Sequence, residues 1–215
     1  MSGTPGRIRS ALSNPDAYWL LQRLLGAVDV HRHVLTHHAR VQPGERVLDL
    51  GCGPGRTLDV LPEVDYLGVD TSSAYVEAAR RRYGQRASFR CADATLADLA
   101  GEAPFDLVLA LGVMHHLDDA QAKRLVGLGE RSLAPAGRMV TLDPGLVEGQ
   151  PAVARWLASR DRGVDVRPPE AYRALAQSGF GSVEVTLRHD LARVPLTHVI
   201  LRCERAGAGR PPPRD

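Results

Sequence analysis

Short apolar runs alternate with longer amphipathic stretches along most of the chain after residue 46. The apolar runs predict β-strands, and the amphipathic stretches between them predict helices. Five strands are expected, at residues 47–50, 66–69, 87–91, 105–111 and 138–142. The fourth run is apolar almost throughout, which is typical of a central parallel strand that is buried on both faces.

The amphipathic stretches predict four helices between and after these strands. A short one covers residues 57–61 and is closed by Pro62. The next begins at Ser72 or Ser73, either of which can cap it, and ends near Gly84. Asp119 is expected to cap a third helix that runs to about residue 133, and residues 170–178 form the last.

Two further strands complete the pattern, at residues 182–187 and 197–203. The nine residues between them leave no room for a crossover helix, so the two strands are expected to pair antiparallel at the sheet edge. Together the elements predict an α/β fold. It is a doubly wound, mostly parallel seven-stranded sheet with the last strand antiparallel and with helices on both faces.

Two segments and a tail lie outside this sheet. Residues 1–40 are expected to form an N-terminal helical cap over the functional site, and residues 41–205 form the domain itself. An insert at residues 144–167 lies on the substrate side of that domain. Residues 206–215 are rich in Gly and Pro, which predicts a disordered tail.

Charge narrows the functional classes. The net charge is +2 and basic residues are scattered among acidic ones, so no nucleic-acid partner is expected. The one basic run, Arg80–Arg82, falls late in a predicted helix, where cations complement the helix dipole.

No apolar run approaches the roughly 20 residues of a membrane helix, and the first residues contain no apolar signal core. We therefore expect a cytoplasmic protein without a membrane partner. The three cysteines lie far apart, which indicates neither a disulfide framework nor a zinc site. His33 and His37 have a spacing compatible with metal binding, but no acidic or Cys partner is near, so a packed or solvated helix face is favoured and no metal is expected.

Three closely spaced glycines follow the first predicted strand, in the segment Val47–Gly55. Glycine there permits a tight turn and lets a ligand approach the bare backbone. The dinucleotide fingerprint G-x-G-x-x-G fits poorly, because the third glycine comes one residue early and Arg56 takes its place. Asp49, just before the loop, would repel a diphosphate but attract an ammonium or sulfonium group. It can also brace the turn by accepting backbone N–H bonds.

Two more carboxylates end the next two strands. Asp70 lies 19 residues beyond Gly51, where an acidic side chain can accept hydrogen bonds from both hydroxyls of a ribose. Its alternative role is to cap the helix that follows. Asp93 can take a donor such as an adenine amino group, or it can cap a helix beginning near Thr95.

These stretches resemble the class I S-adenosylmethionine-dependent methyltransferase family. VLDLGCGPG is similar to its first motif, VDTSS to its second-strand acidic motif, CADA to its adenine-side motif and FDLVLALGVMHHL to its fourth-strand motif. The resemblance covers residues 40–143 closely and extends more loosely to residue 204. It implies S-adenosylmethionine as the cofactor and a methyltransferase activity.

The resemblance also implies which residues hold this cofactor. Those around the methionine part are Asp49, Gly51, Cys52 and Gly53; those around the ribose are Asp70, Thr71 and Ser72; those around the adenine are Asp93 and Ala94; and the site is closed by Leu111, Gly112 and His115.

Two adjacent histidines after the fourth strand are the candidate catalytic residues. His115 and His116 can accept a proton near neutral pH, which helps only when the methyl acceptor must lose one. His115 is favoured to contact the cofactor, whereas a catalytic and a packing role remain equally open for His116.

The small size of the chain favours a small-molecule acceptor, and a homodimer is left open. Tyr18 is a candidate to line an apolar pocket for it. Arg162 and Arg167 are candidates to hold an anionic group, because guanidinium matches carboxylate and phosphate. The alternative is that these arginines pair internally and order the insert. Two other functions stay open: a non-catalytic S-adenosylmethionine-binding domain and an NAD(P)-dependent oxidoreductase.

Overall fold

The computed structural model describes residues 27–151, 155, 165–192 and 196–206. Its strands are β1 (Arg46–Leu50), β2 (Asp65–Asp70), β3 (Ser88–Cys91), β4 (Phe105–Leu111), β5 (Leu133–Pro144), β6 (Ser182–Arg188) and β7 (His198–Glu204). Its helices are α3 (Ala27–His33), α4 (Ser73–Tyr83), α5 (Asp119–Ser132) and α7 (Pro169–Ala176), with a π-helical turn η1 (Val34–Ala39) and 3-10 turns η2 (Arg56–Asp59) and η3 (Met114–His116).

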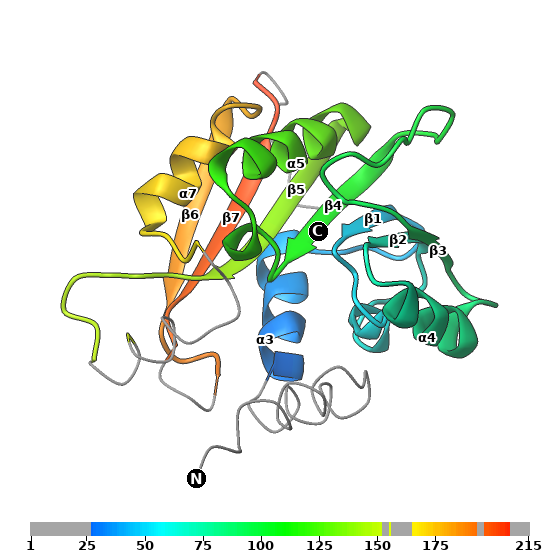
Figure 1. Cartoon of the computed structure of the whole chain (residues 1–215), viewed down its shortest axis with the longest axis horizontal. Coiled ribbons are helices and arrows are strands. Elements are labelled where there is room, and N and C mark those ends of the chain that lie inside the picture. The colour runs from blue at the N-terminus through cyan, green and yellow to red at the C-terminus, as the bar shows by residue number, and fades with distance from the viewer. Residues whose placement is uncertain (1–26, 152–154, 156–164, 193–195, 207–215) are drawn as a thin grey trace, which may run out of the picture.

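The strands form one sheet in the order β3-β2-β1-β4-β5-β7-β6 (Figure 1). Neighbours from β3 to β5 run parallel, whereas β7 is antiparallel to both β5 and β6. The predicted fold class is therefore confirmed, including the reversed last strand. The short β6–β7 connection forces the hairpin, and β7 fills the position between β5 and β6.

Helices cover both faces of the sheet, and each face has its own apolar core. One core packs α5 and α7 against the sheet through residues such as Val108, Leu125 and Tyr172. The other packs α3, η1 and α4 against it through residues such as Val34 and Leu107. Figure 1 shows α5 and α7 together on one side and α3 and α4 on the other. Two-sided burial explains why the β4 sequence is apolar almost throughout.

Several of the predicted helix and strand boundaries were wrong. The residue that caps α5 is Asp118, not Asp119. The Asp118 side chain accepts the Gln121 N–H at 2.8 Å, and the Asp118 N–H donates to the side-chain oxygen of Gln121 at 3.1 Å. The helix expected at 57–61 is the single 3-10 turn η2, and β5 begins at Leu133 rather than at Arg138. The helix expected near Thr95 is absent: the described chain between β3 and β4 contains turns and bends.

A buried arginine fastens the end of η1 to the sheet. Arg138 forms an ion pair with Glu45 at 2.9 Å and donates to the carbonyl oxygens of Ala39 and Arg40. Arg40 itself has a left-handed backbone (φ 51°), which ends the π-helical turn. Helix α3 and η1 are thereby held against β5, as far as the described residues show. None of the helices in the described part of the chain is long and apolar enough to cross a membrane.

Candidate active site

The chain reverses its winding direction between β1 and β4, which lie side by side in the sheet. In open α/β sheets, ligands bind at the carboxyl ends of the strands at such a switch point. The Gly-rich loop follows β1 at this edge, and η3 with its two histidines follows β4. The sequence predicted both groups, and the sheet order brings them to the same edge.

The first glycines of the loop are required by conformation and by contact. Gly51 has φ +78°, and a Cβ atom there would lie 2.5 Å from a methyl group of Val113. The N–H groups of Gly51 and Cys52 both donate to the carbonyl oxygen of Val69, at 2.7 and 3.1 Å. Gly53 has φ +54°, and a Cβ atom there would meet no heavy atom of the described residues within 4 Å. A ligand can therefore reach the backbone beside Gly53.

Asp70 ties this loop to the start of α4. Its Oδ2 accepts the N–H of Gly53 and its Oδ1 accepts the N–H of Ser72, both at 2.8 Å. The helix cap is Ser72, whose hydroxyl accepts the Tyr75 N–H at 3.3 Å. A carboxylate oxygen has more than one acceptor position, so Asp70 can still receive hydroxyl donors.

Asp49, in β1 just before the loop, is a deeply buried carboxylate, with 1% of its surface exposed. Burial raises its pKa to about 6, against the opposing effect of hydrogen bonds from Tyr66 and Thr57. The Tyr66 hydroxyl donates to Asp49 Oδ2 at 2.7 Å. An ionised carboxylate in such a place is costly unless a cation lies near. The local electrostatics therefore suit a positively charged ligand.

Asp93 and Gly112 lie on either side of this loop. Asp93 Oδ1 accepts the N–H of Thr95 at 2.7 Å in a turn, so its predicted alternative role as a helix cap is wrong. Ala94, next to it, is buried. Gly112 has φ +74° and donates to the carbonyl oxygen of Leu142 at 2.6 Å, which ties the end of β4 to β5.

His115 forms a buried pair with a residue that sequence reasoning missed. Its Nδ1 lies 2.8 Å from Asp143 Oδ1, which also accepts the His115 backbone N–H at 3.1 Å. Burial raises the pKa of Asp143, while the bonds from His115 act in the opposite direction. Asp143 Oδ2 is buried without a hydrogen-bond partner among the described residues. The signal available in the sequence was a carboxylate at the end of the fifth strand, the neighbour of the strand that carries His115.

His116 differs from its neighbour in exposure. Its side chain is exposed, whereas His115 is 5% exposed, and the two ring centroids are 4.0 Å apart. The two rings thus form one group, with the buried ring fixed by Asp143 and the second ring at the surface.

Arg167 is buried, and its guanidinium group is fully hydrogen-bonded within the protein. Its five N–H donors reach the carbonyl oxygens of Met114, Leu117 and Asp165 and the carboxylate of Asp119. The predicted substrate contact of Arg167 is therefore wrong, because no donor is left for a ligand. Its position agrees with the alternative, in which the arginine orders the insert by holding η3. The other two predicted acceptor residues, Tyr18 and Arg162, lie outside the described residues.

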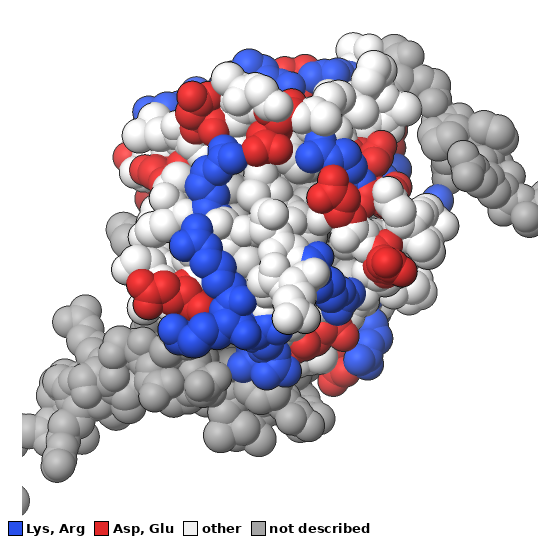
Figure 2. All heavy atoms as spheres, turned by 90° about the vertical axis from the view of Figure 1, so that its right-hand side faces the viewer, with Lys and Arg blue, Asp and Glu red and all other residues white. Residues whose placement is uncertain are grey.

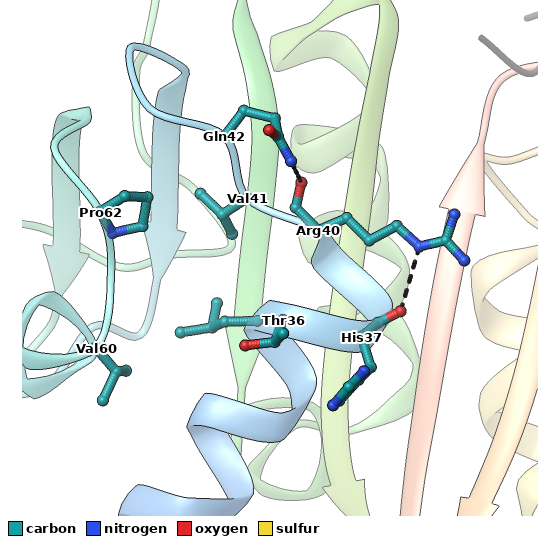
Figure 3. Close-up of a pocket in the computed structure, with 8 residues that line it drawn as sticks. Thr36, His37, Arg40, Val41, Gln42, Val60 and Pro62 are labelled. Atoms are coloured by element: carbon teal, nitrogen blue, oxygen red, sulfur yellow. Dashed lines mark hydrogen bonds between the residues drawn. The ribbon is translucent and has the colours of Figure 1, made fainter. Parts of the chain in front are cut away.

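A separate cavity of about 430 Å³ lies between η1 and the segment that joins η2 to β2 (Figure 3). Figure 3 shows Thr36 and His37 on the helical side and Val60 and Pro62 opposite them. Gln42 donates to the carbonyl oxygen of Arg40 at 3.0 Å across its rim. None of the predicted cofactor residues lines this cavity, so it is not the cofactor site.

The residues at the carboxyl ends of the strands are suited to bind S-adenosylmethionine. The backbone beside Gly53 is open, Asp70 offers carboxylate oxygens, and Asp49 is a buried carboxylate suited to a cation. The fold and this site match those of the class I S-adenosylmethionine-dependent methyltransferases.

Comparison with known proteins agrees with this class. Residues 47–137 match the family described as "Methyltransferase domain", so this stretch of the chain is a methyltransferase domain, and its cofactor is S-adenosylmethionine. This favours methyl transfer over the oxidoreductase alternative.

The sequence relatives and solved structures that resemble this chain include methyltransferases named for differing acceptors. A trans-aconitate 2-methyltransferase of Methylobacterium nodulans is 41% identical over 107 residues, which cover 48% of this chain and 40% of that protein. An O-methyltransferase of Pyrenophora dematioidea is 33% identical over 128 residues, which cover 54% and 47%. The structure of Haemonchus contortus phosphoethanolamine N-methyltransferase 2 has a TM-score of 0.72 at 15% identity and covers 95% of this chain and 60% of that one. The chain matches less than half of the length of these two sequence relatives.

Proposed function

We propose that this chain transfers a methyl group from S-adenosylmethionine to a small-molecule acceptor, and that His115 removes the acceptor proton. The observation that carries the proposal is the buried pair of His115, in η3 after β4, and Asp143, at the end of β5. The class of the domain and the names of its relatives support methyl transfer.

The cofactor supplies the activated methyl group and its own leaving group, so the protein has to align the acceptor, exclude water and handle a proton. Asp49 and the backbone around Gly53 hold the cationic amino-acid part, and Asp70 holds the ribose. Asp93 with Ala94 holds the adenine.

Asp143 selects the tautomer of the His115 ring. A carboxylate at 2.8 Å from Nδ1 keeps the ring proton on that nitrogen, which leaves Nε2 as the basic atom. The same arrangement orients catalytic histidines in other enzymes. An acceptor O–H or N–H donates its proton to Nε2 as its oxygen or nitrogen attacks the methyl carbon. His116, whose ring lies 4.0 Å from that of His115 in a tilted arrangement, is the exposed neighbour of this base.

We further propose an acceptor that carries a carboxylate or phosphate. The relative from Methylobacterium nodulans is named for trans-aconitate, and the Haemonchus contortus structure holds phosphomonomethylethanolamine. Arg162 is the proposed anchor for this group and Tyr18 the proposed wall of the pocket, since Arg167 is already occupied.

One experiment tests the activity and the acceptor together. The purified chain is incubated with methyl-labelled S-adenosylmethionine and a metabolite extract, and labelled products are identified by mass spectrometry. We expect label in a small anionic metabolite. Arg162→Glu should raise the KM for that acceptor and leave the Kd for S-adenosylhomocysteine unchanged. Cofactor binding without any labelled product would overturn the enzymatic proposal and favour the non-catalytic domain.

A further inference from the structure

A second cavity, of about 490 Å³, lies between the segment Thr95–Ala97 and helix α5, and none of the predicted cofactor residues lines it. It exists because the β3–β4 connection forms no helix in the described chain and leaves one side of α5 uncovered. Leu96 on this turn is 68% exposed, the most exposed large apolar side chain of the described residues. The cavity therefore has an apolar side formed by Leu96 and Leu128.

The helical side of this cavity is strongly basic. Lys123, Arg124 and Arg131 all line it, and no carboxylate does. All three side chains are exposed, and none has an ion pair or hydrogen bond to another described residue. Arginines nearby are paired instead: Arg205 with Glu130 at 2.6 Å and Arg90 with Glu102 at 2.7 Å. Three cations converge here without a counter-charge.

One residue that lines this cavity, Thr95, has a buried hydroxyl without a partner among the described residues. Thr95 is 6% exposed, and its Oγ1 has no hydrogen-bond partner among the described residues. Buried hydroxyl groups are normally hydrogen-bonded, so one without a protein partner is expected to bind a ligand or a water molecule. The Thr95 hydroxyl can donate to an anion, while its backbone N–H is already bonded to Asp93.

A glycine in the middle of α5 keeps this space open. Glycine is unfavourable inside a helix, so its presence there needs a reason. For Gly129 the reason is packing, because a Cβ atom would lie 2.6 Å from the sulfur of Met139. For Gly127 the only near neighbour is Arg131 Nη1, at 3.2 Å from the Cβ position. The missing side chain lets the Arg131 guanidinium lie across the cavity.

We propose that this cavity binds an organic phosphate. Lys123, Arg124 and Arg131 hold its phosphate, the Thr95 hydroxyl donates to it, and its apolar part lies against Leu96 and Leu128. Guanidinium and ammonium groups are suited to phosphate, and the uncharged wall adds apolar contact. Because Thr95 N–H holds the Asp93 carboxylate, we expect an occupant to change the affinity for the adenine part of the cofactor. This coupling rests on the proposed role of Asp93.

The test measures binding and does not depend on methyl transfer. Inorganic phosphate and hexyl phosphate are titrated into the full chain by calorimetry at about 150 mM salt, with and without saturating S-adenosylhomocysteine. We expect saturable binding that S-adenosylhomocysteine does not block, with hexyl phosphate at least about tenfold tighter than inorganic phosphate. Equal, weak and non-saturating heats for both probes would overturn the proposal.

Four variants separate this site from general attraction of anions. Arg124→Glu should weaken hexyl phosphate at least about tenfold. Arg81→Glu on α4 is the control, because Arg81 is equally exposed on a helix surface but does not line the cavity. Thr95→Val keeps the shape and removes the donor, and should weaken binding about three- to tenfold. Gly127→Ala should raise Tm and still weaken binding.

These variants also give the results that would refute the site. Equal weakening by Arg124→Glu and Arg81→Glu would show non-specific attraction of anions. Unchanged binding in both Thr95→Val and Gly127→Ala would exclude the cavity as the site. Phosphate binding with an unchanged Kd for S-adenosylhomocysteine would overturn only the coupling through Asp93.

Discussion

Asp49 is expected to make the ligand-free protein less stable, and this expectation can be tested by replacing it with Asn. Burial raises its pKa to about 6 from the ordinary 3.8. Between these pH values the folded state binds more protons than the unfolded state, so stability is lost as pH rises through this window. The loss is complete above about pH 6. Two pKa units correspond to roughly 3 kcal/mol, an upper bound that includes the Tyr66 bond.

The variant Asp49→Asn removes this cost because the amide does not ionise. At pH 8 we expect its free energy of unfolding to exceed that of the wild type by about 1 to 3 kcal/mol, after loss of a charged hydrogen bond from Tyr66. For a chain of this size that is a rise in Tm of roughly 2 to 12 °C. Most of the gain should disappear near pH 4, where the wild-type carboxyl is protonated in the folded state and about half protonated in the unfolded state.

Calorimetric unfolding between pH 4 and 8 measures the stability, and titration with S-adenosylmethionine measures binding. Asp49→Asn should bind the cofactor at least about tenfold more weakly, because it loses the negative charge that faces the cation. Tyr66→Phe is the matched control: it removes the hydrogen bond and keeps the charge. An Asp49→Asn protein that is no more stable than the wild type at pH 8, with the same pH dependence, would refute the reasoning.

Three further predictions follow from other described contacts. Asp143→Asn should lower kcat by roughly 10²- to 10⁴-fold, because the His115 tautomer is no longer fixed. The Kd for S-adenosylhomocysteine should change by less than about threefold. An unchanged kcat would exclude His115 as the base. Arg167→Leu should lower the free energy of unfolding by about 3 kcal/mol, since it leaves the Met114 and Leu117 carbonyls unpaired, whereas the exposed Arg173→Leu on α7 should stay within about 0.5 kcal/mol; chemical denaturation compares the two. Burial lowers the pKa of His198 to about 4 from 6.5, so the unfolded state binds more protons between these values and stability should fall as pH drops from 6.5 to 4; His198→Asn should flatten that part of the Tm profile, and an unchanged slope would contradict it.

The sequence predicted the sheet well because its strands are unambiguous in pattern. The run in β4 is apolar on both sides, and the β6–β7 connection is too short for anything but a hairpin. The errors came where local signals compete. Asp118 and Asp119 are both good caps, and only the reciprocal bond with Gln121 decides between them.

The candidate site was predicted in its local motifs and missed in its long-range pairs. Asp49 and Asp70 are readable because strand ends and glycine spacing place them. Asp143 was missed because its partner His115 lies 28 residues away, in the turn that follows another strand. Arg167 was misjudged for the same reason: its partners in η3 are about 50 residues away, and nothing local shows that its donors are used.

The bonds of Arg167 also make the insert a closed loop with a fixed base. Gly145 forms a bridge with Arg167, and the Leu146 N–H donates to the Arg167 carbonyl oxygen at 3.2 Å, so the two ends of the insert meet at one point of the sheet. The entropy of closing such a loop changes slowly with its length. Segments of other lengths can therefore be grafted between residues 147 and 164 without disturbing the cofactor residues. Under the proposed function, we expect exchange of this one segment to change the acceptor and to leave cofactor binding unchanged.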